Sequence, residues 1–158
     1  LFKFEKSKTM KAQVNEIKIS YKGELKSSMW QKISSSQDAA ELLYEDWDKD
    51  TISIQETFKV VLLNNSNKVK GVYQLSQGGI TSTPIDLRIL FAVILKSLSV
   101  AIILTHNHPS GKLEPSEADK RLTKKIKQAS GLFDISILDH LILTPDGDYY
   151  SFSDNGIL

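Results

Sequence analysis

Apolar positions recur with two different periods along the chain, and the periods alternate from one segment to the next. Over residues 17–21 apolar and polar side chains alternate, which is the period of a half-buried strand. A helical spacing begins after Ser36, a candidate N-cap. Its apolar positions are Ala39, Ala40, Leu42, Leu43 and Trp47. The first third of the chain therefore predicts a strand followed by a helix.

The middle of the chain carries the most apolar segments. Residues 58–63 predict a strand, residues 64–67 a turn and residues 69–75 the returning strand, so a hairpin is expected here. Residues 86–97 are apolar over a helical length. Residues 100–104 form a short apolar run, which is typical of a strand buried on both faces.

The last third begins with a polar loop, expected over residues 105–115. Residues 116–130 then predict an amphipathic helix that ends at a glycine. Two final strands are expected over residues 135–143 and 149–152, joined by a Pro-Asp-Gly turn. Because helices interleave with strands, we expect a single α/β (α+β-like) domain with a mixed β-sheet flanked by helices.

The composition is that of an ordinary globular protein. The chain has 158 residues, of which 41% are apolar and 25% charged, so it can bury a single core. With 20 basic and 19 acidic residues, the formal net charge of +1 gives no general attraction to nucleic acids or membranes. No apolar run approaches the roughly 20 residues that cross a bilayer, so we expect no membrane association.

The absence of cysteine restricts the chemistry of any metal site. Disulfides and thiolate ligands are excluded, so a metal would need imidazole and carboxylate ligands. The same absence fits a cytoplasmic protein, and the N-terminal residues have no signal-peptide core. Residues 1–13 are polar and lysine-rich, and we expect a flexible or cloning-derived arm there, with the folded domain over residues 14–158.

Two histidines follow the predicted buried strand. His106 and His108 are two positions apart, so an extended backbone projects both imidazoles to the same side. Pro109 favours an extended conformation at His108. Asp119 comes eleven residues after His108, in the first turn of the next predicted helix. Two histidines, one carboxylate and a water molecule make a known catalytic zinc arrangement.

A structural explanation also exists for part of this pattern. A single His-x-His sequence in a loop is a weak signal for metal, and Ser116 with Asp119 fits a helix capping box. Acidic residues in a first helical turn also suit the helix dipole. The complete set favours a metal: paired histidines after a buried strand, a proline, a glycine-containing loop, and then Ser and Asp at a helix start.

The sequence His106-Asn107-His108-Pro109-Ser110-Gly111, followed by Ser116 and Asp119, resembles the signature of the bacterial RadC family. RadC proteins are similar to the JAMM (MPN-plus) metalloproteases, whose pattern is a distant glutamate, then His-x-His-Pro, then Ser and Asp. The resemblance covers roughly residues 36–158. It includes the further positions Gln55, Glu56, Gly78, Arg88, Asp139 and His140.

The resemblance implies a cytidine-deaminase-like, JAMM-type architecture and a role for each residue of the motif. His106, His108 and Asp119 would bind Zn²⁺. Glu56 would be the general base that takes a proton from the metal-bound water, and Ser116 would donate a hydrogen bond to the oxyanion. Without the resemblance, Glu56 would be an ordinary residue before a strand.

Some positions depart from the family or stay open. The residues before Glu56 show no helix-hairpin-helix module of the kind that full-length RadC proteins typically carry, and Leu87 stands where the family often has proline. His140 lies in an apolar strand, where a buried structural role is the default and a role beside the metal is the alternative. Arg88 could contact a substrate or pair with a carboxylate.

Three functions compete at this point. The first is zinc-dependent hydrolysis of a peptide or isopeptide bond in an unidentified protein or peptide. The second is a nucleic-acid accessory module, suggested by the association of RadC with DNA repair and by a basic helix. Its cations are Lys120, Arg121, Lys124, Lys125 and Lys127, although such runs are mostly solvated helix faces. The third is a scaffold without chemistry, which the complete ligand set argues against. A homodimer is left open.

Overall fold

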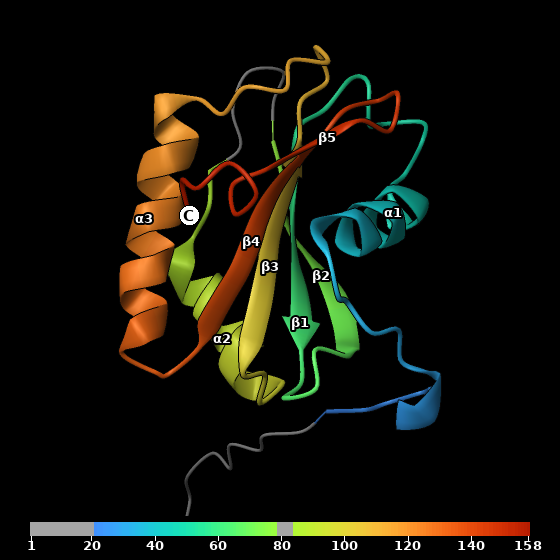
Figure 1. Cartoon of the computed structure of the whole chain (residues 1–158), viewed down its shortest axis with the longest axis vertical. Helices are drawn as coiled ribbons and strands as arrows, with labels where there is room; N and C mark the ends of the chain where they lie inside the picture. Colours follow the sequence, from blue (N-terminus) through green and yellow to red (C-terminus); the bar gives the residue numbers. More distant parts are fainter. Residues whose placement is uncertain (1–20, 79–83) are drawn as a thin grey trace, which may run out of the picture.

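The computed structural model describes residues 21–78 and 84–158, and over these residues the chain forms a sheet of five strands with helices on both faces (Figure 1). The strand order is β2-β1-β3-β4-β5. The strands are β1 (Thr57–Leu63), β2 (Val69–Gln77), β3 (Ala101–Asn107), β4 (Ser136–Leu143) and β5 (Tyr149–Ser151). The helices are α1 (Ser36–Asp46), α2 (Leu87–Lys96) and α3 (Glu117–Gly131), and a 3-10 turn, η1, spans Ser27–Met29.

The sheet is mixed, as the sequence predicted. β1 pairs with both β2 and β3 in antiparallel orientation, and β5 is antiparallel to β4. β3 and β4 are parallel, and α3 makes the crossover that two parallel neighbours require. β1 and β3 are buried along their whole length. The α/β domain with a mixed sheet is therefore confirmed.

Alternate residues of the central strands pack into two cores on opposite faces of the sheet. On one face, Val61 and Ile103 belong to one hydrophobic cluster with Leu43 of α1. On the other face, Val60 and Leu104 pack in a cluster with apolar residues of α2 and α3. Figure 1 shows α1 on one side of the sheet and the other two helices on the opposite side. Successive side chains of a strand point to opposite faces, so both cores come from the same apolar runs.

Most element boundaries differ from the sequence prediction by one or two residues, and two of the differences concern a polar side chain that finds a hydrogen-bond partner. β3 continues to Asn107, although a polar loop was expected from Thr105, so His106 is a strand residue. His106 and Asn107 remain in the buried strand because their polar groups find hydrogen-bond partners inside the protein. The N-cap of α1 is Ser35, one residue before the predicted Ser36, because the Ser35 side chain accepts from the Asp38 backbone N–H.

The predicted arm over residues 1–13 lies outside the described residues, as does most of the strand expected over residues 17–21. Tyr21, the last residue of that predicted strand, is exposed and belongs to no strand. Within the described part of the chain, no helix combines the length and the hydropathy that crossing a bilayer requires.

Candidate metal centre

β3 carries His106 into the interior at one end of the sheet. The strand register pairs His106 with Phe58 of β1 on one side and with Ile142 of β4 on the other. His106 is 1% exposed, and its imidazole stacks on the Phe58 ring, with the ring planes 3° apart. The position and the orientation of this ring are therefore set by the sheet itself.

His108 lies just beyond the end of β3 and is held by its backbone and its ring. Its N–H donates to the Leu143 carbonyl at the end of β4. Its Nδ1 is 2.6 Å from the Lys112 carbonyl oxygen, because the loop turns back after His108. Gly111 makes this turn with a φ of 79°, a conformation that glycine adopts without strain. Because a carbonyl oxygen only accepts, His108 Nδ1 carries a proton, so in the neutral ring Nε2 offers a lone pair.

Asp119 enters the same space from the first turn of α3. Its Oδ2 accepts hydrogen bonds from the Ser116 backbone N–H, at 2.7 Å, and the Ser116 hydroxyl, at 2.6 Å, while the Asp119 N–H donates to Ser116 Oγ. The predicted capping box is thus present. Oδ1 lies 3.4 Å from His106 Nε2, and Oδ2 lies 3.8 Å from His108 Nε2. One carboxylate therefore caps the helix and also faces both imidazoles.

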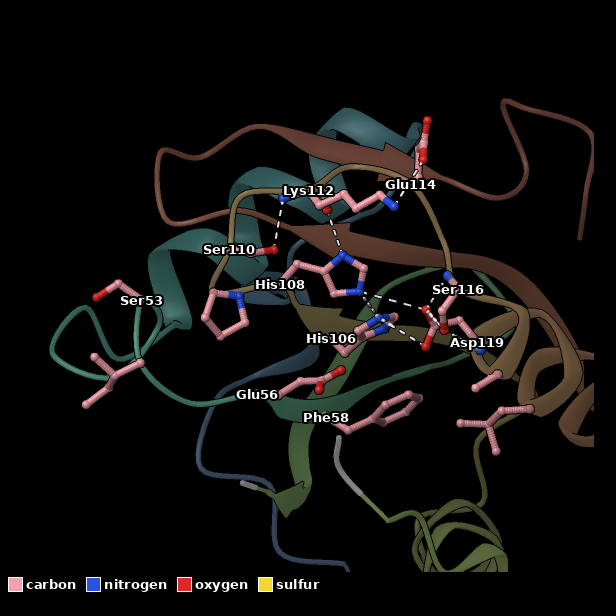
Figure 2. Close-up of a pocket in the computed structure, with 14 residues that line it drawn as sticks. Ser53, Glu56, Phe58, His106, His108, Ser110, Lys112, Glu114, Ser116 and Asp119 are labelled. Atoms are coloured by element: carbon pink, nitrogen blue, oxygen red, sulfur yellow. Dashed lines mark hydrogen bonds and ion pairs between the residues drawn. The ribbon is translucent and has the colours of Figure 1, made fainter. Parts of the chain in front are cut away.

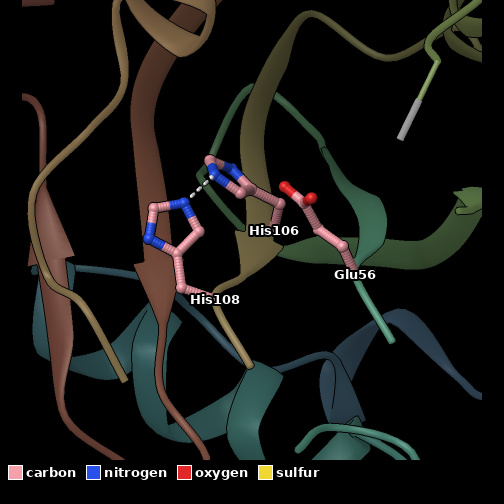
Figure 3. Close-up of side chains that lie close together, drawn as sticks. All are labelled: Glu56, His106 and His108. Carbon is pink, nitrogen blue, oxygen red and sulfur yellow. Dashed lines mark hydrogen bonds between the residues drawn. The ribbon is translucent and has the colours of Figure 1, made fainter. Parts of the chain in front are cut away.

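Glu56 faces the two histidines from the residue before β1. Ligand atoms of Glu56, His106 and His108 all lie within 4.8 Å of one another. Figure 3 shows the Glu56 carboxylate turned toward the imidazoles. The two histidines thus have two carboxylate neighbours, Glu56 and Asp119, and the five residues predicted from the sequence line one pocket of about 600 Å³ (Figure 2).

The proton on His106 is fixed by a chain of buried hydrogen bonds. His106 Nδ1 is 2.9 Å from His140 Nε2, His140 Nδ1 is 2.6 Å from the Thr123 hydroxyl, and that hydroxyl donates to the Asp119 carbonyl oxygen. Since a carbonyl only accepts, His140 Nδ1 must donate to Thr123. Burial holds the pKa of His140 well below its usual value, so the ring is neutral and its Nε2 accepts from His106 Nδ1. His106 Nε2 therefore points a lone pair into the pocket.

The inner end of the pocket is consequently a cluster of acceptors. The Nε2 atoms of His106 and His108 are 3.0 Å apart, and the Asp119 carboxylate lies beside them. Lone pairs this close repel each other unless a proton or a metal ion lies between them. In a tetrahedral zinc site with bonds of about 2.0 Å, ligand atoms are roughly 3.3 Å apart, close to the separations here. The residues present fit a zinc ion in type and in spacing.

The pKa values of Asp119 and His108 are both shifted, and both shifts favour a positive charge beside the Asp119 carboxylate. Burial raises the pKa of the Asp119 carboxyl, but the two imidazoles and the Ser116 hydroxyl outweigh it and hold that pKa well below its usual range. Burial also lowers the pKa of His108, but Asp119 and the Lys112 carbonyl reverse this, and the net pKa is raised. A proton on His108 would therefore occupy the space where a metal ion would bind.

Ser116 lines the pocket, but its hydroxyl proton is already used. The hydroxyl donates to Asp119 Oδ2, so a hydrogen bond to a substrate oxyanion would require the hydroxyl to turn away from Asp119. The oxyanion role remains a prediction from the family resemblance.

Other residues singled out from the sequence lie elsewhere. Arg88 is exposed and pairs with Asp86 at the N-terminus of α2. The Asp139 carboxylate accepts hydrogen bonds from the Ser151 hydroxyl and from the backbone N–H groups of His140 and Ser153. The imidazole ring of His140 is not among these donors.

Sequence reasoning missed the link between Thr123 and His140. One signal was present: Thr123 follows Asp119 by four residues, so the two share a face of the helix.

Comparisons with known proteins place the motif in a family context. A family model described as "RadC-like JAB domain" matches residues 33–157. A UPF0758 protein of Flavobacterium johnsoniae is 55% identical over 102 residues, which are 65% of this chain and 44% of that protein. A UPF0758 protein of Porphyromonas gingivalis is 44% identical over 104 residues, 66% of this chain and 46% of that protein. One of Idiomarina loihiensis is 32% identical over 149 residues, 93% of this chain and 66% of that protein. The chain thus spans about half to two thirds of the length of these relatives.

Proposed function

This chain belongs to the RadC-like JAB domain family, and we propose that it is a zinc-dependent hydrolase of JAMM type that cleaves a peptide or isopeptide bond. The observation that carries the proposal is the acceptor cluster at the inner end of the pocket. Two imidazole lone pairs and a carboxylate converge there, and each imidazole has its proton fixed on the nitrogen that faces away from the pocket.

In this proposal His106, His108 and Asp119 hold the ion. Zinc in such a site acts as a Lewis acid and lowers the pKa of water to roughly 7. The residues supply the rest. His140 and the Lys112 carbonyl keep the two ligand nitrogens deprotonated and oriented, which is the usual contribution of groups behind a metal ligand. The Asp119 carboxylate contributes a negative charge that would stabilise a bound cation.

Glu56 acts as the general base. Its carboxylate faces the imidazoles from the residue before β1, and it can accept a proton from the attacking water and return it to the leaving amine. Such proton transfer typically contributes ~10²–10⁴-fold to a rate. The Ser116 hydroxyl, once turned toward the pocket, would donate to the oxyanion.

The pocket suits a segment of polypeptide. Its walls include the apolar residues Ile54, Pro109 and Leu122, and Lys112 and Glu114 form an ion pair beside it. A volume of about 600 Å³ lies in the range of sites that enclose a small ligand, so a few residues of an extended chain fit there.

Metal analysis tests the proposal directly. After dialysis against a weak chelator, the protein should retain close to one zinc per chain, and zinc-loaded protein should hydrolyse members of a peptide or isopeptide library. Protein whose zinc content is near zero, and does not recover when zinc is added, would rule the site out. The measurement belongs near neutral pH, because protonated imidazoles do not bind metal.

A nucleic-acid accessory role is the alternative. Its support is the run of basic side chains on α3, of which Lys120 already pairs with Glu117. Affinity for DNA that falls steeply with salt, in a protein without hydrolytic activity, would favour this role.

A further inference from the structure

Asn107 stands between the two histidines, and its side chain is 0% exposed. It follows His106 along β3, so its side chain points to the opposite face of the sheet. It therefore cannot reach the metal position in the way that its two neighbours do. Its amide instead makes three hydrogen bonds, and all of them go to the chain segment that precedes and begins β1.

The three bonds lie on both sides of Glu56. Asn107 Nδ2 donates to the carbonyl oxygens of Ile52, at 2.7 Å, and Gln55, at 2.8 Å. Its Oδ1 accepts from the Thr57 backbone N–H at 2.7 Å. The residues directly before and directly after Glu56 are thus attached to the strand that carries His106.

An amide is the side chain that these partners require. Two carbonyl acceptors and one N–H donor need a group with two protons and one lone pair in a fixed plane, and the carboxamide of asparagine offers this arrangement. A carboxylate of the same shape would face two carbonyl oxygens without a proton to give. A hydroxyl would satisfy one or two of the three partners.

The anchored segment also forms one wall of the pocket, since Ser53 and Ile54 line the pocket together with Glu56. We propose that Asn107 is a positioning residue that ties this wall, and with it the Glu56 carboxylate, to the strand of the metal ligands. The proposal rests on the proposed function, because it assigns Glu56 a distance from the ion that must be kept. Displacing a reacting group by about 1 Å can cost ~10²-fold in rate.

Amide hydrogen exchange tests the anchor without metal or substrate. In Asn107→Ala, exchange over residues 52–57 should rise at least about tenfold more than exchange at Val60 and Leu62 within β1, because the segment can open locally. Thr105→Val is the matched control on β3: its buried hydroxyl has no hydrogen-bond partner among residues 21–78 and 84–158, so this variant should leave residues 52–57 unchanged relative to β1. Equal increases in the segment and in β1 would overturn the proposal.

A second variant covers the case in which Asn107→Ala does not fold. Asn107→Asp keeps the shape and the acceptor for Thr57 and loses both donated bonds, so residues 52–55 should still exchange faster than β1. Unchanged exchange in Asn107→Asp would contradict the anchor as well.

The connection to Glu56 is tested with a double-variant cycle in zinc-loaded protein. Asn107→Ala should lower kcat by at least about tenfold while zinc content stays near one per chain, and it should add little to the loss in Glu56→Gln. Equal losses in both backgrounds would show that Asn107 does not act through Glu56. If the wild-type protein binds no zinc, the proposed function fails, and the exchange experiment still decides whether Asn107 holds the segment.

Discussion

Asp119 uses its two carboxylate oxygens for two different neighbours. Oδ2 accepts both hydrogen bonds from Ser116 at the helix N-terminus, while Oδ1 faces His106. The capping explanation and the ligand explanation of this residue, which compete in the sequence, are therefore compatible in the structure. Glu56 differs, because the backbone around it is fixed by Asn107 and its carboxylate is not part of a helix cap.

The two acids should separate by mutation. Glu56→Gln should keep zinc and lose most hydrolysis, by ~10²–10⁴-fold, because the residue accepts a proton and does not hold the ion. Asp119→Asn should lose zinc, because it removes the anionic ligand, and should keep most of the helix cap through Ser116. Zinc content of the two purified variants decides. Equal loss of zinc in both variants would indicate that Glu56 is itself a zinc ligand. The distance of Glu56 from the two imidazoles is short enough for that role.

Thr123 should control zinc affinity without touching zinc. In Thr123→Val, His140 Nδ1 loses its acceptor, so the ring can move its proton to Nε2 and donate to His106. His106 would then carry its proton on the nitrogen that faces the ion, and affinity should fall by ~10–100-fold. Thr123→Ser keeps the hydroxyl and should keep the affinity. Chelator competition measures both, and equal affinities in the two variants would contradict the proton assignment.

At the scale of elements, α1 and α3 begin in the same way. Each has a serine N-cap followed three residues later by an aspartate that completes a capping box: Ser35 with Asp38, and Ser116 with Asp119. Only the second pair lines the pocket. The protein therefore contains its own control for separating the stability of a cap from the chemistry of the site.

Ser35→Ala and Ser116→Ala should each destabilise the protein by ~1 kcal/mol, because each removes one cap. Ser116→Ala should also lower the hydrolysis rate, whereas Ser35→Ala should not. Denaturant unfolding and kinetics on both variants provide the comparison. If the two variants lose the same stability and keep the same rate, Ser116 is a cap and has no role in catalysis.

The elements also show what hydrophobic patterns can and cannot predict. The hairpin of β1 and β2 was predicted from apolar runs that flank a turn, and the helices from helical spacing or from apolar residues over a helical length. The end of β3 was missed because Thr105, His106 and Asn107 are polar, and a pattern of apolar residues contains no information on buried hydrogen bonds. The N-cap of α1 was placed one residue late because Ser34, Ser35 and Ser36 are consecutive.

At the scale of the whole molecule, the site is assembled from distant parts of the chain. Glu56 approaches His106 because β1 and β3 are antiparallel neighbours with Phe58 opposite His106. Asp119 arrives by the crossover helix, and His140 by the parallel strand β4. Local sequence does not show such proximity, so Glu56 was found through the family resemblance, and the links through Thr123 and Asn107 required the structure.

Zinc should reverse the pH dependence of stability. Without metal, burial lowers the pKa of His108, but Asp119 and the Lys112 carbonyl outweigh it and raise that pKa above its ordinary value of 6.5. The stabilisation from protonated His108 is therefore complete below that pH and is lost as the pH rises through the raised pKa. With zinc, His108 must lose its proton, so stabilisation by the metal grows over the same interval. Melting temperatures between roughly pH 5.5 and 8.5, with chelator or with zinc, should change in opposite directions. Melting temperatures that change with pH in the same direction with and without zinc would contradict a competition between the proton and zinc at His108.

The direction of the strands divides the molecule into two ends. The start of β1, the end of β3 and the start of α3 lie at the pocket, whereas the turns over residues 64–67, 97–100 and 131–135 lie at the other ends of the same elements. The seven residues of β3 separate the two ends by roughly 20 Å. We expect insertions and replacements in those turns to leave the pocket residues in place. Sequence change can therefore accumulate at the end that carries these turns while the pocket end keeps its chemistry. Labels or fusion partners are best placed in the same turns, away from the pocket.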